Sequence, residues 1–227
     1  MMSKTANVLL THGAWADGSC WAKVIPILQA QGLNVLAAQI PLTSLEDDIA
    51  VTRRMLGMMP GPTVLVGHSY GGAVITGAAR GAGNVTALVY ITGFGLDEYE
   101  SLETLSKQGP PSAGSAAIGP DSNGYLWIDR ERFHSAFVAD GTATEAAVMA
   151  AVQKPLAIAA FAGASGPPAW KALPSWYLQC TDDQMIPPPA QAFMAERMGA
   201  KVRTVASSHA PFMAHAAAVA EIIAFAC

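Results

Sequence analysis

Three kinds of residue that together can build a nucleophilic serine occur in this sequence: Ser69 within Gly67-His68-Ser69-Tyr70-Gly71, a late histidine, His209, and an acid between them. A serine hydroxyl is a poor nucleophile at neutral pH and needs a base within hydrogen-bond reach. An imidazole, which titrates at about pH 6.5, can take up the proton and return it. A carboxylate on the other ring nitrogen holds the imidazole in the required tautomer. The sequence therefore contains the groups for nucleophilic catalysis by Ser69 with His209 as base.

The weight of the Gly-x-Ser-x-Gly pattern depends on its surroundings, because so short a pattern also arises by chance. Residues 63–66 form an apolar, β-branched run that predicts a strand, and residues 72–79 are small and mostly apolar, which predicts a helix able to lie closely on a sheet. A serine between such a strand and helix lies at a sharp turn that projects its hydroxyl, and glycines beside it avoid steric collisions. We therefore predict Ser69 as the nucleophile.

The base and the acid are predicted in loops that follow strands. His209 comes after a predicted strand over residues 201–206, and the other histidines are predicted in tight turns, in an inserted segment or within the last helix (His12, His68, His134, His215). The acid is expected after the strand of residues 175–179, where Asp183 is our assignment and Asp182 is the alternative. Sites in parallel sheets form beyond the carboxyl ends of the strands. All three groups are predicted at such ends.

The elements that must position these residues are strands and helices in alternation. Strands are predicted over residues 6–10, 33–38, 63–66, 85–92, 175–179 and 201–206, and helices over residues 19–31, 44–58, 72–79, 187–198 and from Pro211 onward. This alternation predicts an α/β fold, a doubly wound and mostly parallel sheet with helices on both faces.

The alternation stops between residues 95 and 172. Loops rich in proline, glycine and serine there separate short helical patterns at residues 101–107, 130–138 and 144–153. We predict a core of residues 1–94 and 173–227 with an inserted helical lid, or cap, of residues 95–172. This segment has more acidic than basic residues and several aromatic ones, which favours a neutral, weakly polar ligand. Trp127 is the lid residue that we expect to contact it.

Composition limits the classes of partner. With 227 residues, of which 52% are hydrophobic, the chain is long enough to bury a full core. Its formal net charge of −4, without runs of like charge, predicts no nucleic-acid partner and no membrane anchor. The three cysteines are widely spaced and suggest neither a disulfide framework nor a metal site. Since the first residues do not resemble a secretory signal, we expect a cytoplasmic protein that acts on a small molecule.

Four motifs resemble α/β-hydrolases related to the plant methyl esterases and hydroxynitrile lyases. They are His12-Gly13-Ala14-Trp15 with Trp21, Gly67-His68-Ser69-Tyr70-Gly71-Gly72, Asp183-Gln184-Met185-Ile186-Pro187 and the late His209. The resemblance implies the α/β-hydrolase fold and Asp183 as the acid. It also implies that the backbone N–H groups of Ala14 and Tyr70 form the oxyanion hole. We expect Trp15, next to that hole, to contact the substrate.

The function expected from these features is that of a serine carboxylesterase that cleaves small neutral esters through an acyl-enzyme, without a cofactor or a metal. Two alternatives stay open: a non-catalytic protein that binds small molecules on the same fold, and a lyase or carbon–carbon bond hydrolase that uses the same triad. In the lyase relatives a lysine follows the catalytic histidine and the oxyanion turn carries a threonine, whereas this chain has Ala210 and Gly13 there. A departing cyanide would lack a compensating positive charge, so we expect hydrolysis.

Overall fold

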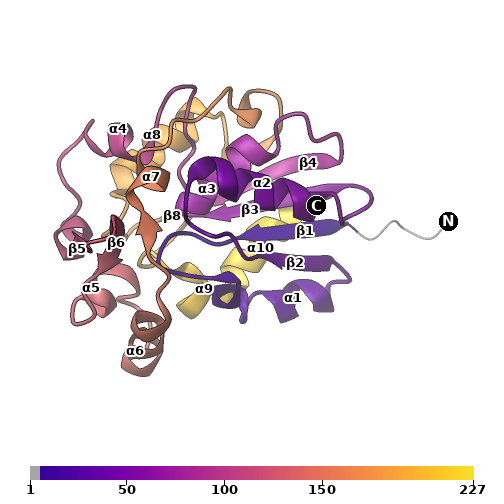
Figure 1. The fold of residues 1–227 in the computed structure, drawn as a ribbon. Coiled ribbons are helices and arrows are strands. Elements are labelled where there is room, and N and C mark those ends of the chain that lie inside the picture. The colour runs from indigo at the N-terminus through magenta and orange to yellow at the C-terminus, as the bar shows by residue number, and fades with distance from the viewer. Residues whose placement is uncertain (1–5) are drawn as a thin grey trace.

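A six-stranded sheet in which neighbouring strands are parallel forms the centre of the protein (Figure 1). The computed structural model describes residues 6–227. The strands lie in the order β2-β1-β3-β4-β8-β9, with the bounds β1 Asn7–Thr11, β2 Asn34–Ala38, β3 Thr63–His68, β4 Val85–Ile91, β8 Ser175–Cys180 and β9 Lys201–Val205. The chain goes from β1 outward to β2 and then returns to the other side of β1 for β3. The direction of winding therefore reverses between β1 and β3.

Helices cover both faces of this sheet. Helices α1 (Ile25–Ala30) and α10 (Ala216–Ala226) lie on one face, and α2 (Leu45–Leu56) and α3 (Tyr70–Ala78) lie on the other (Figure 1). Every residue of β1 and β3 is buried, as expected for strands covered on both sides, whereas the edge strand β9 is mostly exposed. Helix α8 (Pro188–Arg197) packs beside β8. The predicted α/β architecture, with a doubly wound parallel sheet, is confirmed.

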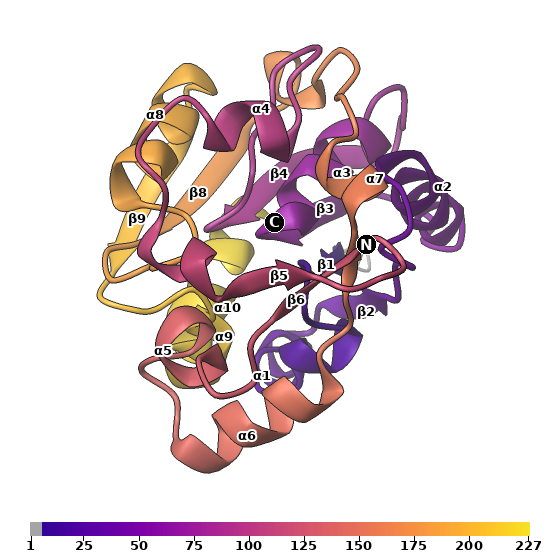
Figure 2. The ribbon, with the colours of Figure 1, turned by 60° about the vertical axis from the view of Figure 1, so that its left-hand side comes forward.

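Between β4 and β8 the chain leaves the main sheet and forms a separate layer at the carboxyl ends of the strands (Figure 2). The helices of this layer are α4 (Leu102–Ser106), α5 (Phe133–Phe137), α6 (Ala143–Val152) and α7 (Ile158–Phe161), with 3₁₀ turns η2 (Ala113–Ala117) and η3 (Ala169–Lys171). The sequence predicted helices only, but the layer also contains a three-stranded antiparallel sheet of β5 (Ile118–Pro120), β6 (Tyr125–Ile128) and β7 (Leu156–Ala157). These strands are too short for a period of two to be recognised in the sequence.

The inserted layer is tied to the loops that follow the main strands. Trp15 N–H, after β1, donates to the carbonyl of Lys154 at 3.0 Å, and Ala157 N–H donates to the carbonyl of Leu42, after β2, at 2.9 Å. Gly114 N–H donates at 2.7 Å to the carbonyl of Gln184, after β8. The insert therefore rests on the edge of the sheet where the predicted site residues lie.

Two helices differ from their prediction. The expected helix over residues 19–31 is split into the 3₁₀ turn η1 (Gly18–Trp21), capped by Asp17, and α1, which has Pro26 in its first turn. Proline has no N–H to donate and fits only the first turn of a helix, so a new helix begins there. The last helix is likewise interrupted, because His215 separates α9 (Pro211–Ala214) from α10.

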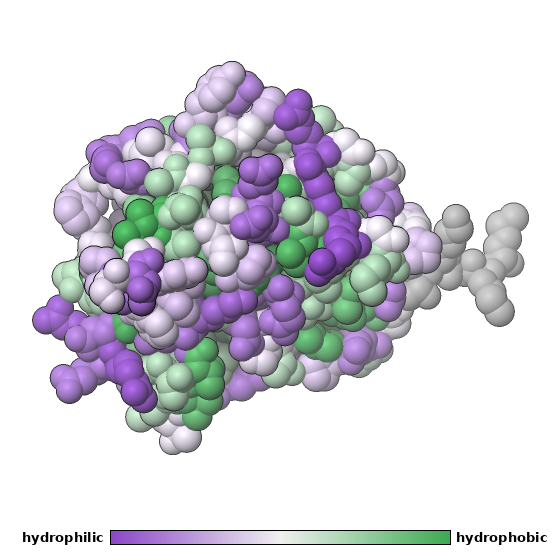
Figure 3. Space-filling view, viewed as in Figure 1, coloured by the Kyte–Doolittle hydropathy of each residue, from purple (hydrophilic) through white to green (hydrophobic). Residues whose placement is uncertain are grey.

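The surface mixes polar and apolar residues on the face seen in Figure 3. Exposed apolar side chains include Val148 and Val152 of α6. Within residues 6–227 no helix is both long and apolar enough to cross a membrane.

Candidate active site

The predicted nucleophile, acid and base lie in the segments that follow three strands of the main sheet. Ser69 follows β3, Asp183 lies in the loop after β8, and His209 lies in the loop after β9. Gly13 and Ala14 follow β1, so they lie where the winding direction of the sheet reverses. Crevices at such reversal points are the common position of binding sites in parallel sheets.

Ser69 lies at a strained turn that close backbone packing imposes. Its φ and ψ are 50° and −122°, a combination that non-glycine residues rarely adopt. A Cβ on Gly67 would lie 2.4 Å from the carbonyl oxygen of Gly71, and a Cβ on Gly71 would lie 2.6 Å from that of His12. Only glycine fits these two positions, so strand, turn and helix approach one another closely. The predicted strand–turn–helix around Ser69 is present.

Backbone hydrogen bonds fix Ser69 on both sides of the turn. Its N–H donates to the carbonyl of Ile91 at 3.2 Å, and its carbonyl accepts from Gly72 at 2.9 Å and from Phe94 at 3.0 Å. Ser69 is 3% exposed. The position of the serine is thus determined by main-chain contacts with β4 and with the loop after it.

The proposed oxyanion-hole residues flank this turn. A Cβ on Gly13 would lie 2.8 Å from the Cβ of Ser69, so the loop carrying Gly13 and Ala14 packs directly against the serine. Tyr70 is the first residue of α3, where backbone N–H groups have no partner within the helix. Both Ala14 and Tyr70 are buried. Their assignment as N–H donors to a reacting oxygen remains a prediction.

Asp183 and His209 form a buried pair. His209 Nδ1 lies 2.8 Å from Asp183 Oδ2, and both side chains are almost inaccessible, at 1% and 0% exposure. Asp183 Oδ1 accepts hydrogen bonds from the backbone N–H groups of Met185 and Ile186 at 2.7 and 3.0 Å. A carboxylate in this position accepts the Nδ1 proton, and the lone pair of His209 is then on Nε2.

Of the two adjacent acids, Asp183 is the one that contacts His209. Asp182 instead accepts a hydrogen bond from Thr181 Oγ1 at 3.2 Å at the surface. Its backbone N–H donates to the carbonyl of Ser207 at 3.1 Å, which joins the acid loop to the histidine loop.

The second ring nitrogen of His209, Nε2, is buried and has no hydrogen-bond partner within residues 6–227. The ring lies 5.0 Å from that of Phe137 and 4.8 Å from that of His68, between centroids. His68 precedes Ser69 in the sequence, and its Nε2 donates to the carbonyl of His209 at 2.8 Å. His68 therefore links the end of the strand that leads to Ser69 with the loop that carries His209.

The other two core histidines serve as neutral structural groups. His12 Nε2 accepts from the N–H of Ile40 at 3.2 Å, and Nδ1 donates to the carbonyl of Gly13 at 2.8 Å. Burial lowers the pKa of His12 to about 4. Burial also lowers the pKa of His68 well below its usual value, and the neighbouring His209 lowers it further. The sequence-based preference for His209 over His12 and His68 is consistent with these roles.

A buried carboxylate lies behind the nucleophile turn. Asp48 of α2 accepts hydrogen bonds from the Tyr70 hydroxyl at 2.6 Å and from the N–H of Leu42 at 2.8 Å. Burial raises the pKa of Asp48 to about 6, while the hydrogen bond from Tyr70 opposes the rise. The Tyr70 hydroxyl is thus bound by Asp48, and the role predicted for Tyr70 concerns only its backbone N–H.

The two predicted substrate-binding tryptophans lie in different surroundings. The ring of Trp15 packs edge-on against Phe137, with centroids 6.4 Å apart, and its Nε1 donates to the carbonyl of Leu126 at 2.9 Å. Phe137 in turn contacts His209, so Trp15 belongs to the apolar surroundings of the base.

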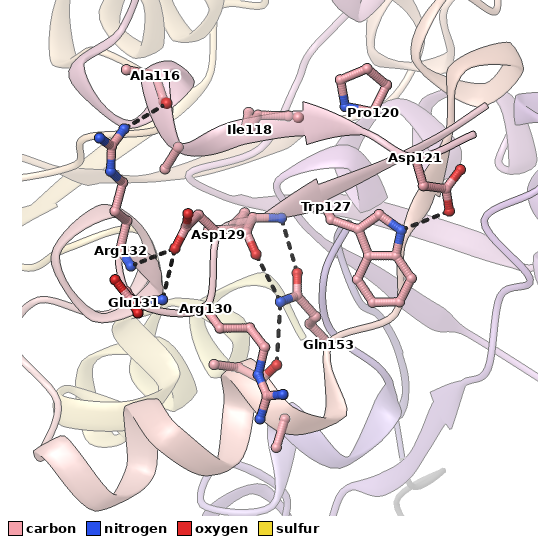
Figure 4. A pocket seen from close by; sticks show the side chains of 15 residues that line it. Ala116, Ile118, Pro120, Asp121, Trp127, Asp129, Arg130, Glu131, Arg132 and Gln153 are labelled. Atoms are coloured by element: carbon pink, nitrogen blue, oxygen red, sulfur yellow. Dashed lines mark hydrogen bonds between the residues drawn. The ribbon is translucent and has the colours of Figure 1, made fainter. Parts of the chain in front are cut away.

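Trp127 lies on the wall of a surface pocket of about 690 Å³ that is built from the insert (Figure 4). Its Nε1 donates to Asp121 at 2.9 Å. The residues that line this pocket do not include Ser69, Asp183 or His209. Contact between Trp127 and a substrate therefore remains a prediction, and this pocket does not adjoin the triad residues.

Sequence reasoning missed several side chains that bind the catalytic groups. Asp183 Oδ2 also accepts from Thr92 Oγ1 at 2.5 Å and from Gln191 Nε2 at 3.1 Å. Thr92 follows β4 with a φ of 38°. A polar residue at the carboxyl end of a predicted strand was a signal for Thr92. Gln191 lies within α8, where its sequence neighbours gave no indication of its role.

Comparison with known proteins places the chain among hydrolases. The model of the alpha/beta hydrolase family matches residues 8–222. The pyrethroid hydrolase of Sphingobium wenxiniae is 27% identical over 242 residues, covering 96% of this chain and 86% of that protein. Methylesterase 1 of Arabidopsis thaliana is 28% identical over 130 residues, covering 50% of this chain and 48% of that protein.

A solved structure agrees with these sequence matches. The crystal structure of a pyrethroid hydrolase from Sphingobium faniae JZ-2 has a TM-score of 0.85, with 25% sequence identity and 98% of each chain covered. The similarity that the catalytic motifs predicted is confirmed, and it extends through the insert because nearly the whole of both chains is aligned. This chain belongs to the alpha/beta hydrolase family.

Proposed function

We propose that this protein is a serine carboxylesterase that cleaves small neutral esters with the triad Ser69, His209 and Asp183. The observation that carries the proposal is the buried His209, whose Nδ1 is paired with Asp183 while Nε2 has no partner within residues 6–227. The same ring packs against that of His68, the residue before the strained Ser69. The similarity to proteins named as a pyrethroid hydrolase and a methylesterase supports ester cleavage as the reaction.

In the proposed reaction, Ser69 Oγ attacks the ester carbonyl and its proton passes to His209 Nε2. The negative oxygen that forms is stabilised by the N–H groups of Ala14 and Tyr70, and a single donor of this kind typically lowers the barrier by about 3 kcal/mol. The His209 proton then goes to the departing alcohol. Water, activated by the same imidazole, hydrolyses the acyl-enzyme and restores Ser69.

The surroundings of the base favour an uncharged substrate. Trp15 and Phe137 place aromatic rings beside His209, and apolar walls of this kind bind uncharged groups at little desolvation cost. We also propose that residues 95–172 act as the lid over a core formed by residues 1–94 and 173–227. The hydrogen bonds from the insert to the loops after β1, β2 and β8 support this division.

The experiment is an assay of purified protein with a panel of p-nitrophenyl esters, together with labelling by an organophosphonate. Ester turnover and stoichiometric labelling of Ser69 are expected, and both should be lost in Ser69→Ala, because only the nucleophilic oxygen is removed. Ser135→Ala, at an exposed serine of the insert, is the matched control and should behave like the wild type. Substantial turnover by Ser69→Ala, or labelling at another serine, would reject the assignment.

The same preparation separates hydrolysis from the lyase alternative. Ala210 follows the histidine, so no lysine at that position compensates the charge of a leaving cyanide. Mandelonitrile should therefore release no cyanide above the uncatalysed background, while an aryl ester is cleaved. Cyanide release without ester cleavage would overturn the proposed reaction but not the assignment of the nucleophile. Stoichiometric binding of ester analogues with neither reaction would favour the binding protein.

A further inference from the structure

One carboxylate of the insert binds the two residues that precede the proposed base. Asp140, between α5 and α6, accepts from Ser207 Oγ at 2.7 Å and from Ser208 N–H at 3.1 Å. It also accepts a short hydrogen bond from Ser208 Oγ. These contacts join residues 67 and 68 positions apart in the sequence. Asp140 thus accounts for three donors of the loop that ends at His209.

Those donors need an acceptor because the loop is buried. Ser207 is 0% and Ser208 is 2% exposed, and a buried hydroxyl without a hydrogen-bond partner destabilises the fold. The Asp140 side chain is itself 25% exposed, so it brings solvent-contacting charge to the edge of the site. Partial burial would raise the pKa of Asp140, but the hydrogen bonds from Ser208 and Ser207 outweigh this and lower the pKa. At neutral pH it is a carboxylate.

The position of this loop sets the position of the imidazole. His209 is the next residue, and its ring meets Asp183 Oδ2 through Nδ1, while the buried Nε2 has no hydrogen-bond partner within residues 6–227. On the core side the loop is held by the hydrogen bond between Asp182 N–H and the Ser207 carbonyl. On the insert side it is held by Asp140, and by Phe137 of the preceding helix, whose ring lies against that of His209. The loop is therefore fixed between two segments.

We infer that Asp140 is a positioning residue for His209: its carboxylate, carried by the insert, holds Ser207 and Ser208 so that the imidazole is aligned between Asp183 and Ser69. The catalytic meaning of this alignment rests on the proposed function, but the alignment itself is a property of the His209–Asp183 pair. The insert then serves catalysis as well as substrate enclosure. Asp140 Oδ2 also lies 3.4 Å from Nε2 of His215.

The test combines NMR with kinetics on the full chain. The proton that His209 Nδ1 donates to Asp183 should give a far-downfield signal in the wild type, absent from Asp183→Asn. In Asp140→Ala this signal should be shifted or broadened away. The kcat for an aryl ester should fall on the order of tenfold, with KM changed by less than about twofold, because a displaced imidazole impairs proton transfer more than binding.

Two further variants separate positioning from general damage. Asp140→Asn keeps one acceptor oxygen for the serines, so it should recover part of the lost kcat and part of the signal. Asp129→Ala removes an insert carboxylate that, within the part of the chain that the structure describes, accepts only from the nearby N–H groups of Glu131 and Arg132, so it should leave both readouts unchanged. An equal loss in Asp129→Ala would overturn the proposal.

The remaining outcomes are also decisive. An unchanged signal and kcat in Asp140→Ala, or a higher KM alone, would show that Asp140 only anchors the insert and would overturn the positioning role. If Asp140→Ala fails to fold, the isosteric Asp140→Asn is compared with the wild type by the same two readouts. A partial loss of both the signal and kcat would support the positioning role, and wild-type values of both would overturn it. A wild type without ester turnover, whose downfield signal still responds to Asp140→Ala, would reject the proposed function while supporting the positioning role.

Discussion

The nucleophile and the base of the candidate site are held by different kinds of contact. Ser69 is fixed by main-chain hydrogen bonds to Ile91, Gly72 and Phe94, and by glycines at which no Cβ fits. The Asp183–His209 pair is held by two backbone N–H groups of its own loop and by side chains that lie after β4, in α8 and in the insert. One side of the site is thus built into the backbone of the core, and the other depends on contacts between distant segments.

This difference has a consequence for substitutions. On the nucleophile side, we expect changes of side chains other than Ser69 to have little effect on catalysis, and added volume at the turn to disturb the fold. On the base side, we expect loss of one polar group to misplace the imidazole. Three variants test the two halves of this contrast.

The largest effect is expected for Asp183→Asn. An amide presents the wrong hydrogen-bonding group to His209 Nδ1, and in the well-studied serine triad such a change costs about four orders of magnitude in kcat. Asp182→Asn is the matched control, since that carboxylate lies at the surface and bonds only Thr181 within the described residues. Steady-state kinetics with an aryl ester checks this. A larger loss in Asp182→Asn would mean that the pair seen here is not the catalytic one.

A smaller but still severe effect is expected for Gly67→Ala, on stability. The added methyl would lie 2.4 Å from the Gly71 carbonyl oxygen, so strand and helix must separate. We expect the free energy of unfolding to fall by about 3 kcal/mol, the upper range for overpacking a core. Gly83→Ala, with no atom within 4 Å of the new Cβ, is the control and should be nearly neutral. Chemical denaturation measures both, and equal stabilities would refute the close-packed turn.

The smallest effect on catalysis is expected for Asp48→Asn, although Asp48 binds Tyr70 beside the nucleophile. The amide oxygen can still accept from the N–H of Leu42, and the amide NH2 can donate to the Tyr70 hydroxyl oxygen, so kcat should change by no more than a few-fold. A change as large as that of Asp183→Asn would abolish the contrast between the two sides.

The difference in stability between the wild type and this variant should depend on pH. The folded-state pKa of Asp48 is raised from 3.8 to about 6, so the folded protein binds this proton more tightly than the unfolded chain does. Its contribution to stability is complete below about pH 4 and is lost as the pH rises to 6 and above. Relative to Asp48→Asn, the wild type should therefore lose about 3 kcal/mol of unfolding free energy over this range. Denaturation at several pH values checks it, and a difference that is independent of pH would contradict the buried, raised carboxyl.

The two sides of the site also differ in how far the sequence alone predicts them. Ser69 and its turn could be predicted because the requirement for glycine is local and leaves a pattern within five residues. His209 and the loop of Asp182 and Asp183 could be placed because each follows a recognisable strand. The choice between the two acids rested on resemblance, and their geometry could not be obtained from adjacent positions.

The sequence by itself determined the alternation of strands and helices, the parallel sheet and the nucleophile turn, since these depend on hydrophobic period and on backbone sterics between near neighbours. Tertiary structure alone decided which polar groups meet. Asp140 reaches Ser207 across 67 positions and Thr92 reaches Asp183 across 91. The small sheet of the insert was likewise hidden, because its strands gain stability from pairing with one another and not from their own short sequences. Contacts of this kind form only when the whole chain has folded, so no local pattern records them.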